Sequence, residues 1–342
     1  MLNCTIVGAT GYTGVELVKI LLRHPCVRVS GLTTRQKEKI PLTQLIPELP
    51  PEVDLEVRPF SFSEIRRTAD VVFLCLPPTE AMPLASKFLE AGKIVIDLSA
   101  DFRLRDWREY GKWYGVKHTN RRALGEAVYG LPELYREKIK RSNLIANPGC
   151  YPTGIILGIA PLLHAGLVDT ASIVVDAKSG VSGAGKKFNP ATQFCEVDEN
   201  FYAYKVGRHQ HIPEIEQALS EAAGVKIHVT FVPHLLPLQR GILTTVYLKR
   251  KRGIDREAIR EAFKNLYGEE PFVRLKPEGS FPALKDVQRT NYCDIGFWAD
   301  PDSDRVIVIT AIDNLLKGAA GQAVQNLNVR SGFPEDQGLK LW

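Results

Sequence analysis

The sequence predicts an α/β protein with two domains, and three observations support that class. Short apolar runs alternate with helical patterns from residue 4 to residue 98, which is typical of a parallel sheet with helices on its faces. A glycine-rich turn directly follows the first of these runs, at residues 4–7. The chain of 342 residues is also long enough for about two domains, each with its own core.

The first domain is predicted to span residues 1–147. Its runs at 71–74 and 94–96 contain only apolar residues, as expected for strands that are buried on both faces of a parallel sheet. A C-terminal helix over residues 314–342 is predicted to join this domain. The expected strands lie at 4–7, 27–32, 71–76, 94–98 and 143–146, and the first helix lies at 15–23.

The second domain is predicted to span residues 148–313. Its strand candidates are longer and more amphipathic, with fewer helical patterns between them, which indicates an α+β domain with a mixed or antiparallel sheet. The expected strands lie at 173–175, 226–232, 242–248, 292–298 and 306–312.

The composition excludes several functional classes. A formal net charge of +5 comes from 44 basic and 39 acidic residues spread along the chain, so no nucleic-acid partner is predicted. No apolar stretch approaches the length of a membrane span, and no signal peptide precedes the first strand. The six cysteines are far apart and include no C-x-x-C pair, the pattern of a reduced, cytoplasmic protein.

Cys150 stands at a predicted strand-to-helix turn. The run at 143–146 reads as a buried strand, Pro148 and Gly149 break it, and an apolar helix follows. A cysteine at this position feels the positive end of the helix and faces unsatisfied backbone N–H groups, which favour the nucleophilic thiolate. The alternative is a buried packing cysteine.

A glycine motif, Gly8-x-x-Gly11-x-x-Gly14, follows the first strand and opens the first helix. Glycines there let backbone N–H groups approach a pyrophosphate at the helix N-terminus. The spacing differs from G-x-G-x-x-G, but the strand, turn and helix are those of a Rossmann-type dinucleotide-binding domain; an unliganded tight turn is the alternative. The predicted cofactor-binding residues of the turn are Gly8, Thr10, Gly11, Tyr12, Thr13 and Gly14.

The end of the second strand predicts NADP rather than NAD. An NAD enzyme places an acidic residue there for the ribose 2′-hydroxyl, and the stretch from Ser30 to Gln36 has none. Thr34 and Arg35 instead offer a hydroxyl and a guanidinium, which suit a 2′-phosphate. Pro77 ends another strand at the same edge and is predicted to line the cofactor crevice.

His209, His211 and Glu214 form the best group to move protons for a cysteine nucleophile. Two imidazoles stand two residues apart, and Glu214 lies in the first turn of the helix that starts near Pro213. A His-x-His metal site is the alternative, but no third or fourth ligand stands at zinc spacing, so no metal is predicted. Either imidazole is a candidate to face the sulfur.

Residues 178–187 are predicted to form a glycine- and serine-rich loop with three lysines. Its backbone N–H groups, hydroxyls and positive charge suit a phosphate or a carboxylate, and a plain surface loop is the alternative. The predicted ligand-binding residues of the loop are Ser179 and Gly180 for the cofactor, and Ser182, Gly183 and Lys186 for the substrate.

Two motifs of the chain are specific: Tyr-Gly-Leu-Pro-Glu-Leu at 129–134 and Pro-Gly-Cys-Tyr-Pro-Thr at 148–153. In these motifs the chain resembles the N-acetyl-gamma-glutamyl-phosphate reductase family of the aspartate-semialdehyde dehydrogenase superfamily. The family has arginine between the two histidines, where this chain has Gln210. Further matching motifs lie at 8–14, 97–103, 180–185, 209–215 and 313–323, so the resemblance covers essentially the whole chain.

The resemblance implies a role for each candidate residue. Cys150 would attack an acyl phosphate, His209 would be the acid/base, and His211 with Glu214 would orient or support it. Asn314, at the head of the last helix, would reach the nicotinamide. The enzyme would be a homodimer or homotetramer that acts on a small molecule.

The reaction that the family implies is the NADPH-dependent reduction of N-acetyl-L-glutamyl 5-phosphate to N-acetyl-L-glutamate 5-semialdehyde and phosphate, in arginine biosynthesis. The enzymatic alternative is a reductase of a glutamyl or aminoadipyl phosphate attached to a carrier protein. The non-enzymatic alternative is an NADP-binding redox sensor in which Cys150 is oxidised.

Overall fold

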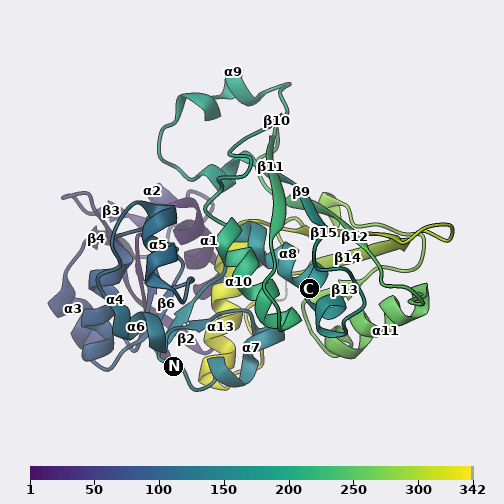
Figure 1. Cartoon of the computed structure of the whole chain (residues 1–342). Coiled ribbons are helices and arrows are strands. Elements are labelled where there is room, and N and C mark those ends of the chain that lie inside the picture. Colours follow the sequence, from purple (N-terminus) through teal and green to yellow (C-terminus); the bar gives the residue numbers. More distant parts are fainter. Residues whose placement is uncertain (340–342) are drawn as a thin grey trace. The chain divides into compact units, whose positions relative to one another are not determined.

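The computed structural model describes residues 1–339 and divides into two compact units (Figure 1). Unit 1 contains Met1–Pro148 and the chain from Ala319 onward, and unit 2 contains Gly149–Gly318. The sequence predicts limits at 147/148 and 313/314. Over the described residues, no helix has both the length and the hydropathy that crossing a membrane requires.

Unit 1 is built on a sheet whose described strands run in the order β3-β4-β2-β1-β5-β6-β8-β7. All neighbouring strands are parallel except β3 and β4. The strands are β1 (Leu2–Val7), β2 (Val27–Thr34), β3 (Ile40–Pro41), β4 (Glu56–Pro59), β5 (Val71–Leu74), β6 (Ile94–Asp97), β7 (Val128–Tyr129) and β8 (Leu144–Ala146). Because β2 and β5 flank β1, the strand order reverses at β1, where doubly wound sheets bind ligands at the carboxyl ends of their strands.

The helices of unit 1 connect these parallel strands and complete its core. They are α1 (Tyr12–Leu21), α2 (Leu42–Leu45), α3 (Phe62–Thr68), α4 (Ala81–Glu90), α5 (Trp107–Tyr114), α6 (Arg121–Glu126), α7 (Pro132–Ile139) and α13 (Gly321–Ser331). One apolar cluster gathers Val72 and Val95 of the sheet with Phe88 of α4, so this helix packs on the sheet.

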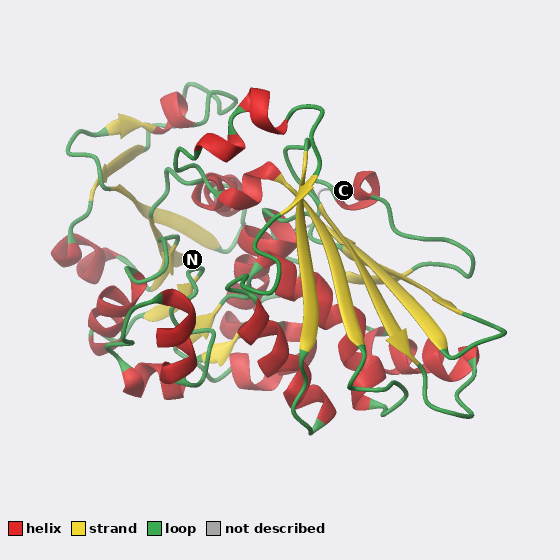
Figure 2. Cartoon of the chain, turned by 45° about the horizontal axis from the view of Figure 1, so that its top comes forward, coloured by secondary structure: helices red, strands yellow, loops and turns green. Residues whose placement is uncertain are grey.

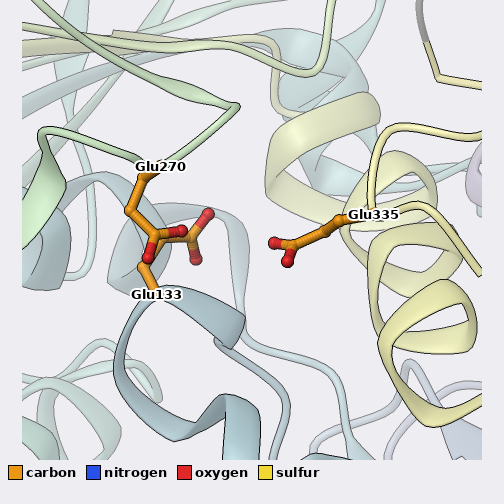
Figure 3. A group of neighbouring side chains, drawn as sticks. All are labelled: Glu133, Glu270 and Glu335. Atoms are coloured by element: carbon orange, nitrogen blue, oxygen red, sulfur yellow. The ribbon is translucent and has the colours of Figure 1, made fainter. Parts of the chain in front are cut away.

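Helix α13 packs against α1 and α7 although its sequence is rich in amides. Gln325 Nε2 donates to the carboxylates of both Glu133 and Glu335, at 2.9 and 2.8 Å; Figure 3 shows these two side chains, from α7 and from the segment after α13. Asn326 Nδ2 donates to Gly130 O at 2.8 Å. The buried side-chain amides of α13 are tolerated because they donate hydrogen bonds to other residues of unit 1.

The predicted helix over 314–342 is wrong at both ends. Leu316–Ala320 form a π-helical turn, η3, and α13 begins only at Gly321. The Asp313 carboxylate accepts the N–H groups of Leu315 and Leu316. The Asp313 carbonyl accepts the N–H of Gly318, five residues on, at 2.9 Å, which is the wide spacing of a π-turn and not that of an α-helix. At the other end Gly332 adopts a left-handed conformation, φ +70°, that ends the helix. Residues 340–342 lie outside the described chain.

Unit 2 contains a mixed sheet, as the sequence predicts, with its described strands in the order β10-β11-β9-β12-β15-β14-β13. Figure 2 shows its long strands side by side. Its elements are α8 (Cys150–His164), β9 (Ile173–Gly180), η1 (Val181–Ala184), η2 (Pro190–Thr192), α9 (Phe194–Val197), β10 (Tyr202–Ala203), α10 (Ile212–Ala223), β11 (Val229–Leu236), β12 (Ile242–Lys249), α11 (Arg256–Tyr267), β13 (Val273–Leu275), α12 (Leu284–Val287), β14 (Cys293–Ala299) and β15 (Arg305–Ile312).

One face of this sheet is covered by α8, whose residues from Tyr151 to Leu163 are all buried. Gly154 and Gly158 allow the close approach, because a Cβ atom at Gly158 would lie 2.7 Å from Thr310 Cγ2 of β15. The opposite face is open in the single chain. Tyr247, Trp298 and Val174 are 44%, 41% and 37% exposed there.

Candidate active site

The structure places Cys150 at the first residue of α8, directly after an extended Gly149. Gly318 lies against it, because a Cβ atom built there would be 2.9 Å from Cys150 Cβ. The backbone N–H of Gly149 donates to Glu214 Oε1 at 2.7 Å. Glu214 is buried, so its carboxylate does not face solvent. It instead anchors the turn that carries the Cys150 thiol.

His209 is buried beside this turn in an edge-to-face contact with Tyr151, 5.4 Å between ring centroids. Its Nδ1 accepts the backbone N–H of His211 at 3.1 Å, and its Nε2 lies 3.4 Å from the Tyr204 hydroxyl. Burial, followed by the charges of His211 and Lys205, lowers the pKa of His209 to about 2. The imidazole is therefore neutral at physiological pH, and its ring nitrogens have distinct partners.

Two tyrosines complete this group, and neither is among the predicted site residues. Tyr204 OH donates to Tyr151 OH at 3.2 Å, and Tyr151 OH donates to the carbonyl of His234 at 3.1 Å. Burial is the main cause that raises the pKa of each phenol, and the charge of Cys150 contributes to both. Tyr151 lies inside a recognisable motif, whereas no spacing rule marks Tyr204.

Asn314 lies before η3 and does not head a helix, in contrast to the prediction. Its Oδ1 accepts the N–H of Gly241 at 2.7 Å, and its Nδ2 donates to Ser182 Oγ at 2.9 Å. These two bonds fix which end of the carboxamide is the donor. Asp313 holds the segment in place by accepting the backbone N–H of Arg289 at 2.7 Å.

The predicted loop at 178–187 is wrong over its first three residues, because β9 continues to Gly180 and η1 follows. A Cβ atom at Gly180 would lie 2.7 Å from Arg240 N, so the strand end is packed against the chain before β12. Ser179 is buried there and donates to Gly180 O. Gly183 is exposed within η1 and Lys186 is exposed after it. Of the predicted substrate residues, Ser182 bonds Asn314.

In unit 1 the glycine turn lies at the carboxyl end of β1. Gly8 has φ +90°, and a Cβ atom there would be 2.3 Å from Cys75 O. A Cβ atom at Gly14 would be 2.4 Å from Gly8 O. Helix α1 then starts at Tyr12 with no side chain capping it at Gly11, and Thr10 and Thr13 lie in the same turn. The close-packed glycines and the uncapped helix start fit a pyrophosphate.

Arg35 directly follows β2, and its guanidinium forms an ion pair with Glu80. Thr34 Oγ1 accepts the N–H of Gln36 at 3.2 Å. Pro77 follows β5, and the next loop includes Thr79 at φ +80°. Both strands flank β1, so all these residues lie at the edge where the strand order reverses.

Asp101 holds the loop after β5 in this conformation. Its carboxylate accepts the backbone N–H groups of Thr79, Ala81 and Met82 at 2.6, 3.0 and 3.1 Å, and Tyr110 OH donates to it at 2.6 Å. Four donors on one buried carboxylate make the edge rigid and cap the start of α4.

Comparison with known proteins identifies the family. The description "Semialdehyde dehydrogenase, NAD binding domain" matches residues 3–142, and "Semialdehyde dehydrogenase, dimerisation domain" matches residues 150–314. The N-acetyl-gamma-glutamyl-phosphate reductase of Pelotomaculum thermopropionicum is 51% identical over 98% of this chain and 96% of its own length. The chain belongs to the N-acetyl-gamma-glutamyl-phosphate reductase family.

Other members and solved structures extend this assignment. The reductase of Desulfotalea psychrophila is 48% identical over 100% of this chain and 99% of its own length. Aspartate semialdehyde dehydrogenase II from Vibrio cholerae superimposes with a TM-score of 0.70 at 19% identity, over 97% of this chain and 98% of that one. At that identity the structural likeness shows the shared fold, and the family assignment rests on the reductases.

The neutral state of His209 predicts how stability depends on pH. Below its ordinary pKa of 6.5 the unfolded chain takes up a proton at this residue, whereas the folded chain does so only near pH 2. The free energy of unfolding should therefore fall as the pH is lowered below 6.5, with His209 contributing up to about 1.4 kcal/mol per pH unit. Urea unfolding of wild type and His209→Gln between pH 4 and pH 7 measures the difference.

The control is His228→Gln, whose imidazole is exposed and which should keep the pH slope of the wild type. An unchanged slope in His209→Gln would show that His209 is protonated in the folded chain.

Proposed function

We propose that the chain reduces N-acetyl-L-glutamyl 5-phosphate to N-acetyl-L-glutamate 5-semialdehyde and phosphate with NADPH as reductant, in arginine biosynthesis. The observation that carries the proposal is the placement of Cys150 at the start of a buried helix whose next residue, Tyr151, contacts the neutral imidazole of His209. The full-length similarity to reductases of that name supports the choice of substrate.

Cys150 begins the reaction. Its thiolate, favoured by the helix start, attacks the acyl carbon, so a C–S bond forms while the C–O bond to phosphate breaks and phosphate leaves. Backbone N–H groups of the first turn of α8 stabilise the negative charge that develops on the acyl oxygen.

The second half reduces the thioester and releases the product. When bound at the β1 edge, NADPH supplies the hydride for this reduction. His209 gives a proton to the carbonyl oxygen as charge develops there and takes it back as the C–S bond breaks. The aldehyde leaves, and Cys150 returns to the thiolate.

The test mixes purified protein with N-acetyl-L-glutamyl phosphate and NADPH and follows the absorbance of the reduced cofactor. Cys150→Ser should lose at least about a thousandfold in turnover, because a hydroxyl is a far weaker nucleophile than a thiolate. Cys195→Ser is the matched control, since that exposed thiol on α9 is outside the group described above.

Phosphate-dependent turnover by Cys150→Ser would contradict the covalent route. A faster reaction with a carrier-linked glutamyl phosphate than with the free acetylated substrate would show that the protein is a carrier-dependent reductase.

We also propose that NADP is the preferred dinucleotide, bound at its 2′-phosphate by Thr34 and Arg35. The Arg35 guanidinium pairs with Glu80 in the isolated chain. On binding, this guanidinium would exchange the Glu80 carboxylate for the 2′-phosphate. No carboxylate follows β2 before residue 38 to bind a 2′-hydroxyl.

Arg35→Ala should raise the KM for NADPH by about tenfold or more and leave the KM for NADH nearly unchanged. The reason is that a charge-assisted hydrogen bond contributes about 1.5 to 3 kcal/mol. Steady-state kinetics with both cofactors measure this. Arg58→Ala, at another exposed arginine of unit 1, should alter neither KM, and an equal loss for both cofactors would argue against a 2′-phosphate contact.

We further propose that the open face of the second sheet joins two copies of the chain in a homo-oligomer. Tyr247 lies between Val174 of β9 and Ile307 of β15 in the strand register, and Ile307 faces Trp298 of β14. This apolar row crosses four strands, and Tyr247, Trp298 and Val174 in it are exposed, as in surfaces that favour association.

Tyr247→Glu should lower the molar mass measured by light scattering, because a carboxylate in the centre of the row would be desolvated in the oligomer. The control is Val225→Glu, at an exposed apolar residue after α10, which should keep the mass of the wild type. An unchanged mass in Tyr247→Glu would place the interface elsewhere.

A further inference from the structure

Tyr204 lies where a long excursion of the chain returns to the second sheet. The segment between η1 and β10, which carries η2 and α9, extends away from β11 (Figure 1). It rejoins the sheet as β10 pairs with β11, and the backbone N–H of Tyr204 donates to Pro233 O at 3.0 Å. The phenol is therefore fixed by sheet pairing directly beside it, with its ring 5.6 Å from the ring of His209.

The hydrogen bonds around Tyr204 have a single consistent direction. The carbonyl of His234 only accepts, so Tyr151 must donate to it, and the Tyr204 proton is then used on Tyr151. The Tyr204 oxygen is left as an acceptor toward His209. At the other end, the backbone N–H of His211 only donates, so His209 Nδ1 is an acceptor and the ring proton is on Nε2. The hydrogen bonds at Tyr204 and those at His209 thus both require the imidazole proton to lie on Nε2.

Two other histidines show the same pattern and support this assignment. Nδ1 of His24 accepts the N–H of Cys26, and its Nε2 contacts Asn328 Oδ1; Nδ1 of His118 accepts the N–H of Asn120, and its Nε2 contacts the Asp101 carbonyl. Both Nε2 atoms meet an oxygen that accepts. His209 differs in that the oxygen at its Nε2 is a side-chain hydroxyl, that of Tyr204.

We propose that Tyr204 is the positioning residue of His209: its hydroxyl oxygen accepts the Nε2 proton and so fixes both the tautomer and the orientation of the imidazole. The inference rests on the proposed function for its kinetic consequence, but the proton position itself requires no substrate. Tyr204 acts through His209 and takes no part in bond making.

Tyr204→Phe tests the proposal, with Tyr202→Phe as the matched control. Tyr202 lies two residues away in β10, and its hydroxyl donates to Ala191 O within the same excursion, so the control removes one hydroxyl from the same segment. Tyr204→Phe should lower kcat about tenfold with little change in the KM for the acyl phosphate, because one hydrogen bond that orients the acid is lost. Tyr202→Phe should change neither.

Nitrogen NMR of histidine-labelled protein supplies a second readout. Wild type should show His209 protonated at Nε2 and slow exchange of that proton with water, and Tyr204→Phe should show fast exchange. A proton on Nδ1 in the wild type would overturn the proposal, as would a Tyr204→Phe variant with wild-type kcat and wild-type exchange. If the wild type does not reduce the acyl phosphate, the proposed function falls, while the NMR result still decides the role of Tyr204.

Discussion

The candidate active site depends on one buried hydrogen bond, from the N–H of Gly149 to the carboxylate of Glu214. It joins the start of α8 to the start of α10, two helices that pack against each other. Cys150 is the next residue after Gly149, and the two histidines directly precede α10. The bond therefore fixes the thiol relative to the imidazoles. A charged acceptor in a buried position makes such a bond strong and its loss costly.

Around this anchor, burial determines which groups carry charge. Desolvation keeps His209 neutral and raises the pKa values of Tyr151 and Tyr204, so these three hydrogen-bonding groups are neutral at physiological pH. The helix start then supplies the positive potential that the thiolate requires. Neutral donors at fixed positions suit a reaction in which charge appears and disappears on the substrate oxygen.

In unit 1, other interactions hold the backbone at the edge of the sheet that is proposed to bind the dinucleotide. Asp101 accepts four hydrogen bonds and holds Thr79 in a left-handed conformation that a non-glycine residue rarely adopts. On the other side of β1 the edge depends on the missing side chain of Gly8. Asp101 acts through the hydrogen bonds that its carboxylate accepts, and Gly8 acts through the absence of a Cβ atom. Both keep the backbone close to the place where a phosphate would bind.

The sequence by itself determined the local features: the glycine turn after β1, the strand-to-helix turn before Cys150, and the mixed second sheet. Each follows from periodicity and breakers over a few residues, and motif resemblance added the family. Tertiary structure decided the pairs that are distant in sequence: Tyr151 with Tyr204 across 53 residues, Gly149 with Glu214 across 65, and Ser182 with Asn314 across 132. It also decided that β9 runs through Ser179 and that the last helix starts after Asp313. Local propensity cannot specify these contacts, because each depends on where the packing of a sheet and its helices brings a remote side chain.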